Sequence, residues 1–437
     1  MFNELIHPFR QAIFNKSNST DVSLFSILFL IIPIALITGP AIPDIIVSLI
    51  AFYFLIKSVL HKQWNYYKNP IFFGFFIFSC YGIIRSLFSD MPIESLTNEG
   101  SLFYFRYIFF AMGTWFLLDK NPQLSKCIMT VSILCLILVC FDGLFQYLFG
   151  TNIFGIKAIS SFRITGLFGN EPIMGRYIAM LSIFTFALIY QNILKTKRYF
   201  ILAITFLVMS EVVVFLSGER VPLFYVTIFS ISIIIFLPFY RFYRIIGFLV
   251  STIIIIVILQ YNPSAKERMI TQTLKEISTT KLSYLPYNKS YEEHYVSAIA
   301  MFYDSPLFGV GTNTFRFQSQ KTEYNPNKFD INSHPHNYYI QTLAELGIFG
   351  FMFLVIFYLY LLLQLLRHFY FVITDNSLKQ MPFNNFLYLL ILFIYWWPII
   401  PHMSLYNNWN NVLLMLPLGF FMKYFFSNPK NENSTNF

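Results

Sequence analysis

The sequence predicts an all-α integral membrane protein with about twelve transmembrane helices and one long loop on the outer face. Hydrophobic residues make up 56% of the 437 residues and charged residues only 12%, about half the charge of a typical soluble domain. Uncharged runs of about twenty residues recur, and that length crosses a hydrocarbon core of about 30 Å. The polar residues 1–21 lack the apolar core and cleavage site of a signal peptide, so we expect the first helix to remain as a span.

Hydropathy locates the expected spans along the chain. The first two are separated by a Gly-Pro turn, and the last three follow a long polar segment. The twelve spans are expected at about Ser23–Thr38, Ile45–Leu60, Ile71–Phe88, Leu102–Leu118, Cys127–Phe149, Pro172–Tyr190, Tyr199–Leu216, Val221–Pro238, Ile245–Gln260, Tyr338–Leu366, Phe386–Ile400 and Val412–Phe426.

The charges of the short loops predict the orientation, because cytoplasmic loops carry an excess of Lys and Arg. Loop Gly39–Asp44 has no base, and loop Ser89–Ser101 carries acidic residues instead. We therefore expect both termini in the cytoplasm and residues 261–337 outside, which in a bacterium is the periplasm. The basic connections contain Lys57, Lys62 and Lys68; Lys120 and Lys126; Lys195, Lys197 and Arg198; Arg241 and Arg244; and Arg367 and Lys379.

These spans divide the chain into a membrane region 1–260, a periplasmic loop 261–337 with short helices, a membrane region 338–426 and a cytoplasmic tail 427–437. The net charge of +9 is scattered over short loops, which favours contact with anionic membrane lipid over nucleic acid. All four cysteines lie in apolar segments, which argues against a disulfide framework. No internal repeat is visible, which disfavours a secondary transporter.

Five arginines are expected near the outer face, against the positive-inside trend. Arg presents a rigid fork that suits phosphate oxygens, so a ring of them there fits a lipid-linked pyrophosphate. The alternative for any one of them is contact with lipid headgroups by snorkelling. The five are Arg85, Arg106, Arg163, Arg176 and Arg220, of which Arg220 in Ser217-Gly218-Glu219-Arg220 is the strongest candidate.

Two histidines, His334 and His336, begin the stretch Asn332–Gly350, which we expect to continue without a break into an apolar helix. Imidazole has an ordinary pKa near 6.5, so either could accept a hydroxyl proton at neutral pH. An exposed loop histidine is the alternative for one of them. A metal site is disfavoured because the one nearby carboxylate is Asp330 and no cysteine lies nearby.

His336-Asn337, nine further residues and then Gly347-Ile348-Phe349-Gly350 resemble the His-Asn-(nine)-Gly-x-x-Gly motif of the O-antigen ligase and polymerase family. Other parts agree in order: residues 163–170, Ser217–Arg220, the turn Pro306-Leu307-x-Gly309-x-Gly311 and the closing Asn407-Asn408-Trp409. The motifs extend over about residues 163–421. The histidine motif with its spacing is the most specific of them.

The resemblance implies a GT-C-like glycosyltransferase that works without a metal or other cofactor. Ligases of this family move a glycan from undecaprenyl pyrophosphate to lipid A–core, with inversion, at the periplasmic face of the bacterial inner membrane. By position, His336 looks like the catalytic base and Arg220 like a pyrophosphate-binding arginine, with His334, Asn337, Arg176, Gly309 and Gly311 in supporting positions. Gly309 and Gly311 belong to a turn that could let the backbone approach a ligand.

The family's second essential arginine has no unique counterpart in this chain. Many relatives have Arg at the start of the helix before the glycine turn, where this sequence has Glu292-Glu293-His294. His294, Arg268 or Arg316 could supply the missing charge, with Arg163 as a further phosphate contact. The reaction also stays open: we favour the ligase over a polymerase that joins repeat units, a ligase that glycosylates protein, or a transporter of polyprenyl-linked glycan.

Overall fold

The computed structural model describes residues 8–13, 19–97, 100–160, 162–193, 197–237, 240–279, 289–326, 333–374 and 380–426. These residues form helices joined by loops and short turns and contain no β-strand beyond isolated bridges. The expected tail 427–437, Asp330 and parts of the predicted periplasmic loop lie outside the described residues. The all-α prediction is confirmed.

Each of the twelve predicted spans overlaps a helix. Among the described residues, eight helical stretches are long and apolar enough to cross a membrane by length and composition, and three apolar helices are shorter. The exact number of spans therefore stays a prediction. The helices are α2 (Thr20–Ala35), α3 (Ala41–Leu60), α4 (Pro70–Leu87), α6 (Arg106–Lys120), α7 (Leu124–Phe149), α8 (Met174–Ile193), α9 (Lys197–Leu216), α10 (Arg220–Phe236), α11 (Arg241–Tyr261), α16 (Tyr338–Ile373), α17 (Phe383–Tyr395) and α18 (Asn408–Phe426).

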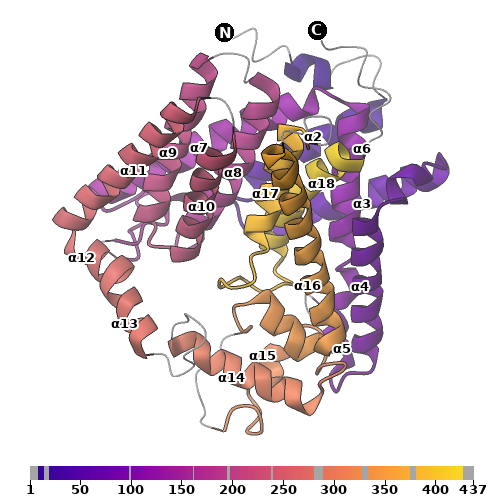
Figure 1. Cartoon of the computed structure of the whole chain (residues 1–437). Helices are drawn as coiled ribbons and strands as arrows, with labels where there is room; N and C mark the ends of the chain where they lie inside the picture. The colour runs from indigo at the N-terminus through magenta and orange to yellow at the C-terminus, as the bar shows by residue number, and fades with distance from the viewer. Residues whose placement is uncertain are drawn as a thin grey trace.

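Shorter helices occupy the loops. In Figure 1, α12 and α13 continue downward from α11, and α14 and α15 lie below α16. Asn262 begins this segment, since its side chain accepts a hydrogen bond from Ala265 N at 3.1 Å and Pro263 fills the first turn. The short helices are α5 (Pro92–Thr97), α12 (Pro263–Lys266), a π-helical turn (Glu267–Thr271), α13 (Gln272–Thr279), α14 (Lys289–Asp304) and α15 (Phe315–Gln318).

Polar contacts show which helix ends lie together. At one end of the bundle, Lys57 pairs with Asp21 at 2.6 Å and Lys423 pairs with Asp119 at 3.5 Å. These contacts join the start of α2, the end of α3, the end of α6 and the end of α18. This is the end at which the loop charges predict the cytoplasm.

The opposite end carries the outer segments. Arg85, near the end of α4, donates from its Nη2 atom to the Gly309 carbonyl at 2.6 Å. Ser95 of α5 donates to the Thr312 carbonyl at 2.9 Å. The turn that follows α14 is therefore anchored to α4 and α5, at the end where α16 begins.

Helix α16 is interrupted, so the expectation of an unbroken helix after the histidines is wrong. Gly347 has φ 63° and ψ −162°, a conformation that glycine adopts without a side-chain clash. A Cβ at Gly347 would lie 2.4 Å from the Leu307 carbonyl carbon. The break lets Ile348 N donate to Pro306 O at 2.9 Å, and Tyr81 Oη donates to Leu346 O at 2.7 Å. Protein groups thus satisfy the freed backbone, as non-helical backbone at membrane depth requires.

Candidate functional site

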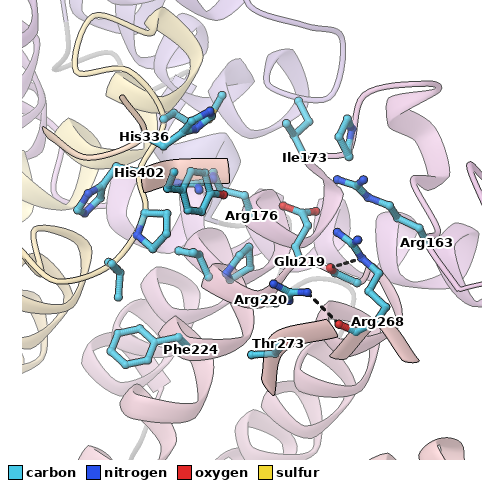
Figure 2. A pocket seen from close by; sticks show the side chains of 18 of the residues that line it. Arg163, Ile173, Arg176, Glu219, Arg220, Phe224, Arg268, Thr273, His336 and His402 are labelled. Atoms are coloured by element: carbon cyan, nitrogen blue, oxygen red, sulfur yellow. Dashed lines mark hydrogen bonds between the residues drawn. The ribbon is translucent and has the colours of Figure 1, made fainter. Parts of the chain in front are cut away.

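A cavity of about 540 Å³ lies between the starts of α8 and α10, the π-helical turn, the histidine segment and the loop that precedes α18. Figure 2 shows the arginines gathered toward one side of this cavity and His336 and His402 toward the other, with Arg176 between them. The ionisable residues that line it are Arg163, Arg176, Arg220, Arg268, Glu219, His334, His336 and His402, with Tyr291 beside them.

The Ser217–Arg220 segment forms the turn between α9 and α10. Gly218 has φ 67°, so glycine suits the turn without strain. Glu219 begins α10, and its Oε1 atom accepts a hydrogen bond from Gly175 N at 2.6 Å. Arg220 is the first residue of α10 and faces the cavity (Figure 2). The turn therefore holds a carboxylate and a guanidinium next to each other at the cavity wall.

Arg268 lies on the π-helical turn and makes reciprocal contacts with this segment. Its Nε atom donates to Gly218 O at 3.1 Å, and Arg220 Nη2 donates to Arg268 O at 3.0 Å (Figure 2). A π-helical turn of this kind is rare and occurs frequently at functional sites. Among the three residues considered for the second cation, the structure places Arg268 in the cavity lining.

Arg163 and Arg176 complete the arginine side. Arg176, on α8, is buried at 8% exposure, and its Nη1 atom lies 3.5 Å from Asn410 Oδ1. The loop that carries Arg163 is fixed by Gln146 Oε1, which accepts hydrogen bonds from the amides of Thr165 and Gly166 at 2.8 Å each. Four guanidiniums thus reach one cavity from four separate segments of the chain.

Glu219 is the acidic residue in this cluster. Burial raises the pKa of Glu219 to about 7, although Arg176 and its hydrogen bond from Gly175 act in the opposite direction. The carboxyl group is therefore close to half-ionised at neutral pH. The cluster keeps a strong positive charge, since four guanidiniums face a single partly ionised carboxyl group.

His336 is held in an unusual backbone conformation, with φ 56°. Such a conformation is sparsely populated for a residue with a side chain and persists only where the surroundings impose it. His402 N donates to the His336 carbonyl at 2.6 Å. Asn337 then caps α16, because its side chain accepts from Tyr339 N at 2.9 Å and Ile340 N at 3.1 Å. The next loop and the helix cap together fix the height of the imidazole.

Aromatic and imidazole rings surround His336. The ring of His334 lies 4.2 Å from that of His336, the ring of Tyr291 5.0 Å and the ring of His294 5.5 Å, measured between centroids. Burial lowers the pKa of His336 to about 4, with further contributions from His294 and Arg176. His336 is therefore neutral at pH 7, with a free nitrogen lone pair, and the same shift makes it a weaker base than an exposed histidine.

Several residues that the sequence singled out lie next to the cavity without lining it. His294, on α14, is buried behind His336. Arg316, on α15, donates to Asn313 Oδ1 at 3.2 Å. Asn337 turns away, since its Nδ2 atom donates to Pro398 O at 2.8 Å. None of these three side chains is part of the cavity lining.

Gly309 and Gly311 bring the backbone of their turn against α16. Val310 N donates to Ala344 O at 3.0 Å, and Gly311 N donates to Glu345 O at 2.9 Å. A Cβ at Gly309 would lie 2.3 Å from the Glu345 carbonyl carbon. The close approach that the turn predicted is thus to the broken part of α16, where it supports the helix below His336.

His402 and Tyr291 line the cavity although no motif in the sequence pointed to either residue. His402 stands alone in Pro401-His402-Met403, 66 positions after His336. Tyr291 begins the described side chains of α14, three positions before His294. The proximity of His402 to His336 depends on the antiparallel return of α17 against α16, which no local pattern encodes.

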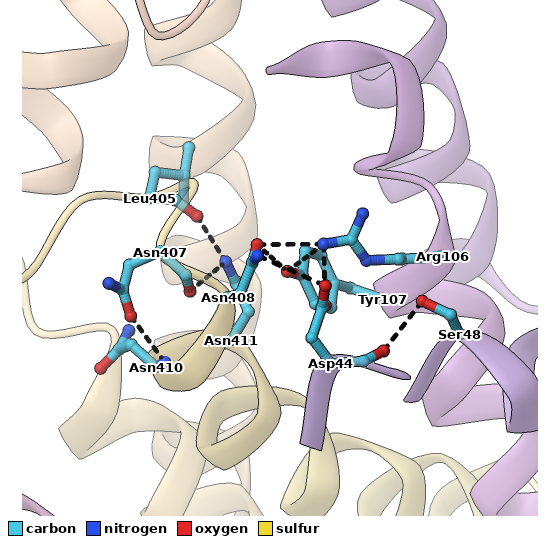
Figure 3. A network of polar contacts seen from close by, with 9 residues as sticks. All are labelled: Asp44, Ser48, Arg106, Tyr107, Leu405, Asn407, Asn408, Asn410 and Asn411. Atoms are coloured by element: carbon cyan, nitrogen blue, oxygen red, sulfur yellow. Dashed lines mark hydrogen bonds and ion pairs between the residues drawn. The ribbon is translucent and has the colours of Figure 1, made fainter. Parts of the chain in front are cut away.

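Arg106, like Arg85 near the end of α4, joins separate segments of the fold. Arg106 pairs with Asp44 at 2.8 Å and donates to Asn408 Oδ1 at 3.0 Å (Figure 3). Asn408 belongs to the closing Asn407-Asn408-Trp409 motif, and Trp409 Nε1 donates to Leu36 O at 2.8 Å. This motif therefore joins the start of α18 to α2, α3 and α6.

The described residues contain no group of three or more His, Cys, Asp or Glu side chains arranged to hold a metal ion. The imidazoles of His294, His334 and His336 are grouped by ring contacts. Most side-chain nitrogen atoms in the described cavity lining belong to guanidinium groups. A guanidinium cannot ligate a metal because it stays protonated.

The fold and the cavity define a helical membrane protein with an arginine-rich site beside a neutral histidine. A family model described as O-antigen ligase matches residues 203–355, a region that includes Ser217–Arg220, the glycine turn and the histidine motif. The match confirms the resemblance to the O-antigen ligase and polymerase family over these residues. No curated protein matches the chain.

Proposed function

We propose that this protein is an O-antigen ligase-type glycosyltransferase that moves a glycan from undecaprenyl pyrophosphate to lipid A–core. The observation that carries the proposal is the 540 Å³ cavity in which His336 meets Arg163, Arg176, Arg220 and Arg268. The site is expected at the periplasmic face of the inner membrane, because the loop charges put the histidine segment outside. A lipid-linked donor and a lipid acceptor both reach an enzyme at that interface.

The arginine side fits the pyrophosphate of the donor. When the glycosyl bond breaks, negative charge develops on the departing phosphate oxygen, and preorganised guanidiniums stabilise that charge. Arg220 donates to the Arg268 carbonyl and Arg268 donates to the Gly218 carbonyl, which keeps their positions fixed before the donor binds. In this proposal the guanidiniums supply the positive charge that a metal ion supplies in other phosphate chemistry.

His336 is the proposed base. An acceptor hydroxyl oxygen attacks the anomeric carbon, the bond from that carbon to the pyrophosphate breaks, and the hydroxyl proton moves to the His336 imidazole. A single displacement inverts the anomeric centre. The low pKa of His336 keeps the imidazole unprotonated, and a bound pyrophosphate anion opposes the arginines and raises its basicity.

An O-antigen polymerase would use the same donor chemistry on a different acceptor, and an acceptor on protein is equally compatible with the cavity. A transporter of polyprenyl-linked glycan would place its cations at mid-depth, whereas the cavity lies at the starts of α8 and α10. The acceptor therefore decides between these functions.

The lipopolysaccharide banding pattern of a strain without this gene tests the proposal. We expect long polymer to accumulate on undecaprenyl pyrophosphate while lipid A–core carries none. Core that carries one repeat unit would indicate a polymerase and refute the ligase reaction. Complementation with His336→Ala should fail although the protein inserts, and complementation with His61→Ala, a histidine exposed at the opposite end, should succeed.

A further inference from the structure

His402 is a buried imidazole with no assigned task. It lies in the loop between α17 and α18, lines the cavity and is 1% exposed. Neither ring nitrogen has a hydrogen-bond partner among the described residues. Most buried polar side chains are hydrogen-bonded, because an unsatisfied one loses its interactions with water without replacement. A ligand in the cavity would supply what the protein does not.

The ring is held in one place. It stacks on Tyr338, with centroids 4.0 Å apart and planes 18° apart. The Tyr338 hydroxyl in turn contacts Asn410 Nδ2, and Asn410 also lies against Arg176. The backbone amide of His402 bonds to the His336 carbonyl. His402 is thus fixed next to the proposed base through its backbone and its ring, and both of its buried ring nitrogens lack a hydrogen-bond partner among the described residues.

The charge of His402 indicates the kind of ligand. Burial and the nearby Arg176 hold the pKa of His402 well below its ordinary value, so the ring is neutral at pH 7. A neutral imidazole has one N–H donor and one nitrogen acceptor. A sugar hydroxyl donates and accepts as well, whereas a pyrophosphate oxygen only accepts and has guanidiniums to bind it. The pairing therefore favours a sugar hydroxyl.

We propose that His402 is a sugar-binding residue that forms a hydrogen bond with a sugar hydroxyl beside His336. The proposal rests on the proposed glycosyl transfer and adds a specificity residue on the histidine side of the cavity. The hydroxyl belongs either to the donor sugar or to the acceptor sugar. Both sources share the same chemistry, and kinetics separate them.

The test compares His402→Phe and His402→Gln with the wild type in nanodiscs. The donor is the strain's own undecaprenyl-pyrophosphate-linked glycan and the acceptor is its lipid A–core. Phe keeps the stack on Tyr338 and the backbone amide but removes both polar atoms, so we expect KM for one substrate to rise about three- to tenfold. Gln keeps a donor and an acceptor and should recover part of that loss. The substrate whose KM rises identifies the source of the hydroxyl.

Undecaprenyl pyrophosphate without sugar serves as a second probe. Its inhibition constant should stay unchanged in His402→Phe and rise in Arg220→Ala, because only the arginine contacts the pyrophosphate. A purely structural role of His402 would instead lower the melting temperature and kcat without selectivity for either substrate, and that result would overturn the proposal. His402→Leu removes the same two polar atoms and replaces the Phe variant if that variant does not fold.

A matched control is His368→Phe. His368 is also buried, at 2% exposure, and its Nδ1 atom accepts from Met381 N at 3.2 Å far along α16 from the cavity. We expect unchanged KM values for this control. If the wild type itself transfers no glycan, the proposed function fails; if it does and His402→Phe keeps both KM values, only the inference about His402 fails.

Discussion

Two groups of arginines, all expected near the outer face, perform different tasks. Arg85 and Arg106 contact protein groups: Arg85 donates to the carbonyls of Phe88, Phe308 and Gly309, and Arg106 pairs with Asp44. The other group, Arg163, Arg176, Arg220 and Arg268, lines one cavity together with a single described acid, Glu219.

The difference between the groups is how their charge is compensated. A guanidinium that faces a carboxylate, as Arg106 does, or several carbonyls, as Arg85 does, stabilises the contact between segments. Such a guanidinium has little capacity left for an anion. Four guanidiniums around one partly ionised carboxyl group leave net positive charge, which binding of a pyrophosphate would neutralise. Depth in the membrane therefore does not distinguish a phosphate-binding arginine from a structural one. The groups that each guanidinium contacts make that distinction.

The largest expected effect separates the two groups by mutation. Arg220→Ala should reduce glycan transfer by about 100-fold or more, as loss of one preorganised donor to a developing oxyanion does, with little change in melting temperature. Arg106→Ala should show the converse, because it leaves Asp44 without its ion pair: a lower melting temperature and near-normal transfer per folded molecule. Transfer assays and thermal melts of both variants in nanodiscs measure this, and equal losses of transfer would erase the distinction.

A smaller effect concerns the acid within the cavity group. The pKa of Glu219 is raised to about 7, so the carboxyl is neutral below that pH and charged above it. Its charge repels the donor, and KM for the donor should rise as pH increases from 6 to 8, by roughly two- to fivefold for a pKa change of about half to one unit on binding. Glu219→Gln keeps the acceptor for Gly175 N and should make KM independent of pH in this range. A slope that persists in the variant would assign the titration to another group.

The smallest expected change is the decrease of kcat/KM as the pH falls below 7. With the pKa of His336 lowered to about 4, the base stays unprotonated as pH falls, and activity is lost only near that pH. In the Glu219→Gln background we expect less than about a twofold decrease between pH 7 and 5.5, whereas an unshifted imidazole would lose about tenfold. A decrease centred near pH 6.5 would show that His336 is not the base or is not buried in the working enzyme.

The sequence predicted the helical membrane class because the requirement is local. Lipid imposes length and hydropathy on each span separately, so the segments could be recognised one at a time. The His336-Asn337 motif and the Ser217–Arg220 segment were also visible, since their residues are contiguous. Capping by Asn337 and the left-handed Gly218 are of the same local kind.

Contacts between distant segments could not be predicted in this way. The choice of Arg268 over Arg316 and His294 as a cavity residue depends on the docking of the π-helical turn against Gly218. The break at Gly347 depends on Pro306 to Phe308, which lie about forty residues earlier in the chain. Arg106 looks like a site residue until its partner Asp44 is seen, 62 positions away.

The sequence by itself determined the class of protein, the helices and the two motifs that point to phosphate and proton transfer, because each follows from neighbouring residues and the solvent around them. Only the tertiary structure decided which arginines are neutralised and which surround a cavity, and that His402 lies beside His336. The physical reason is that charge compensation and burial depend on side chains far apart in the chain, which the fold brings within hydrogen-bond distance.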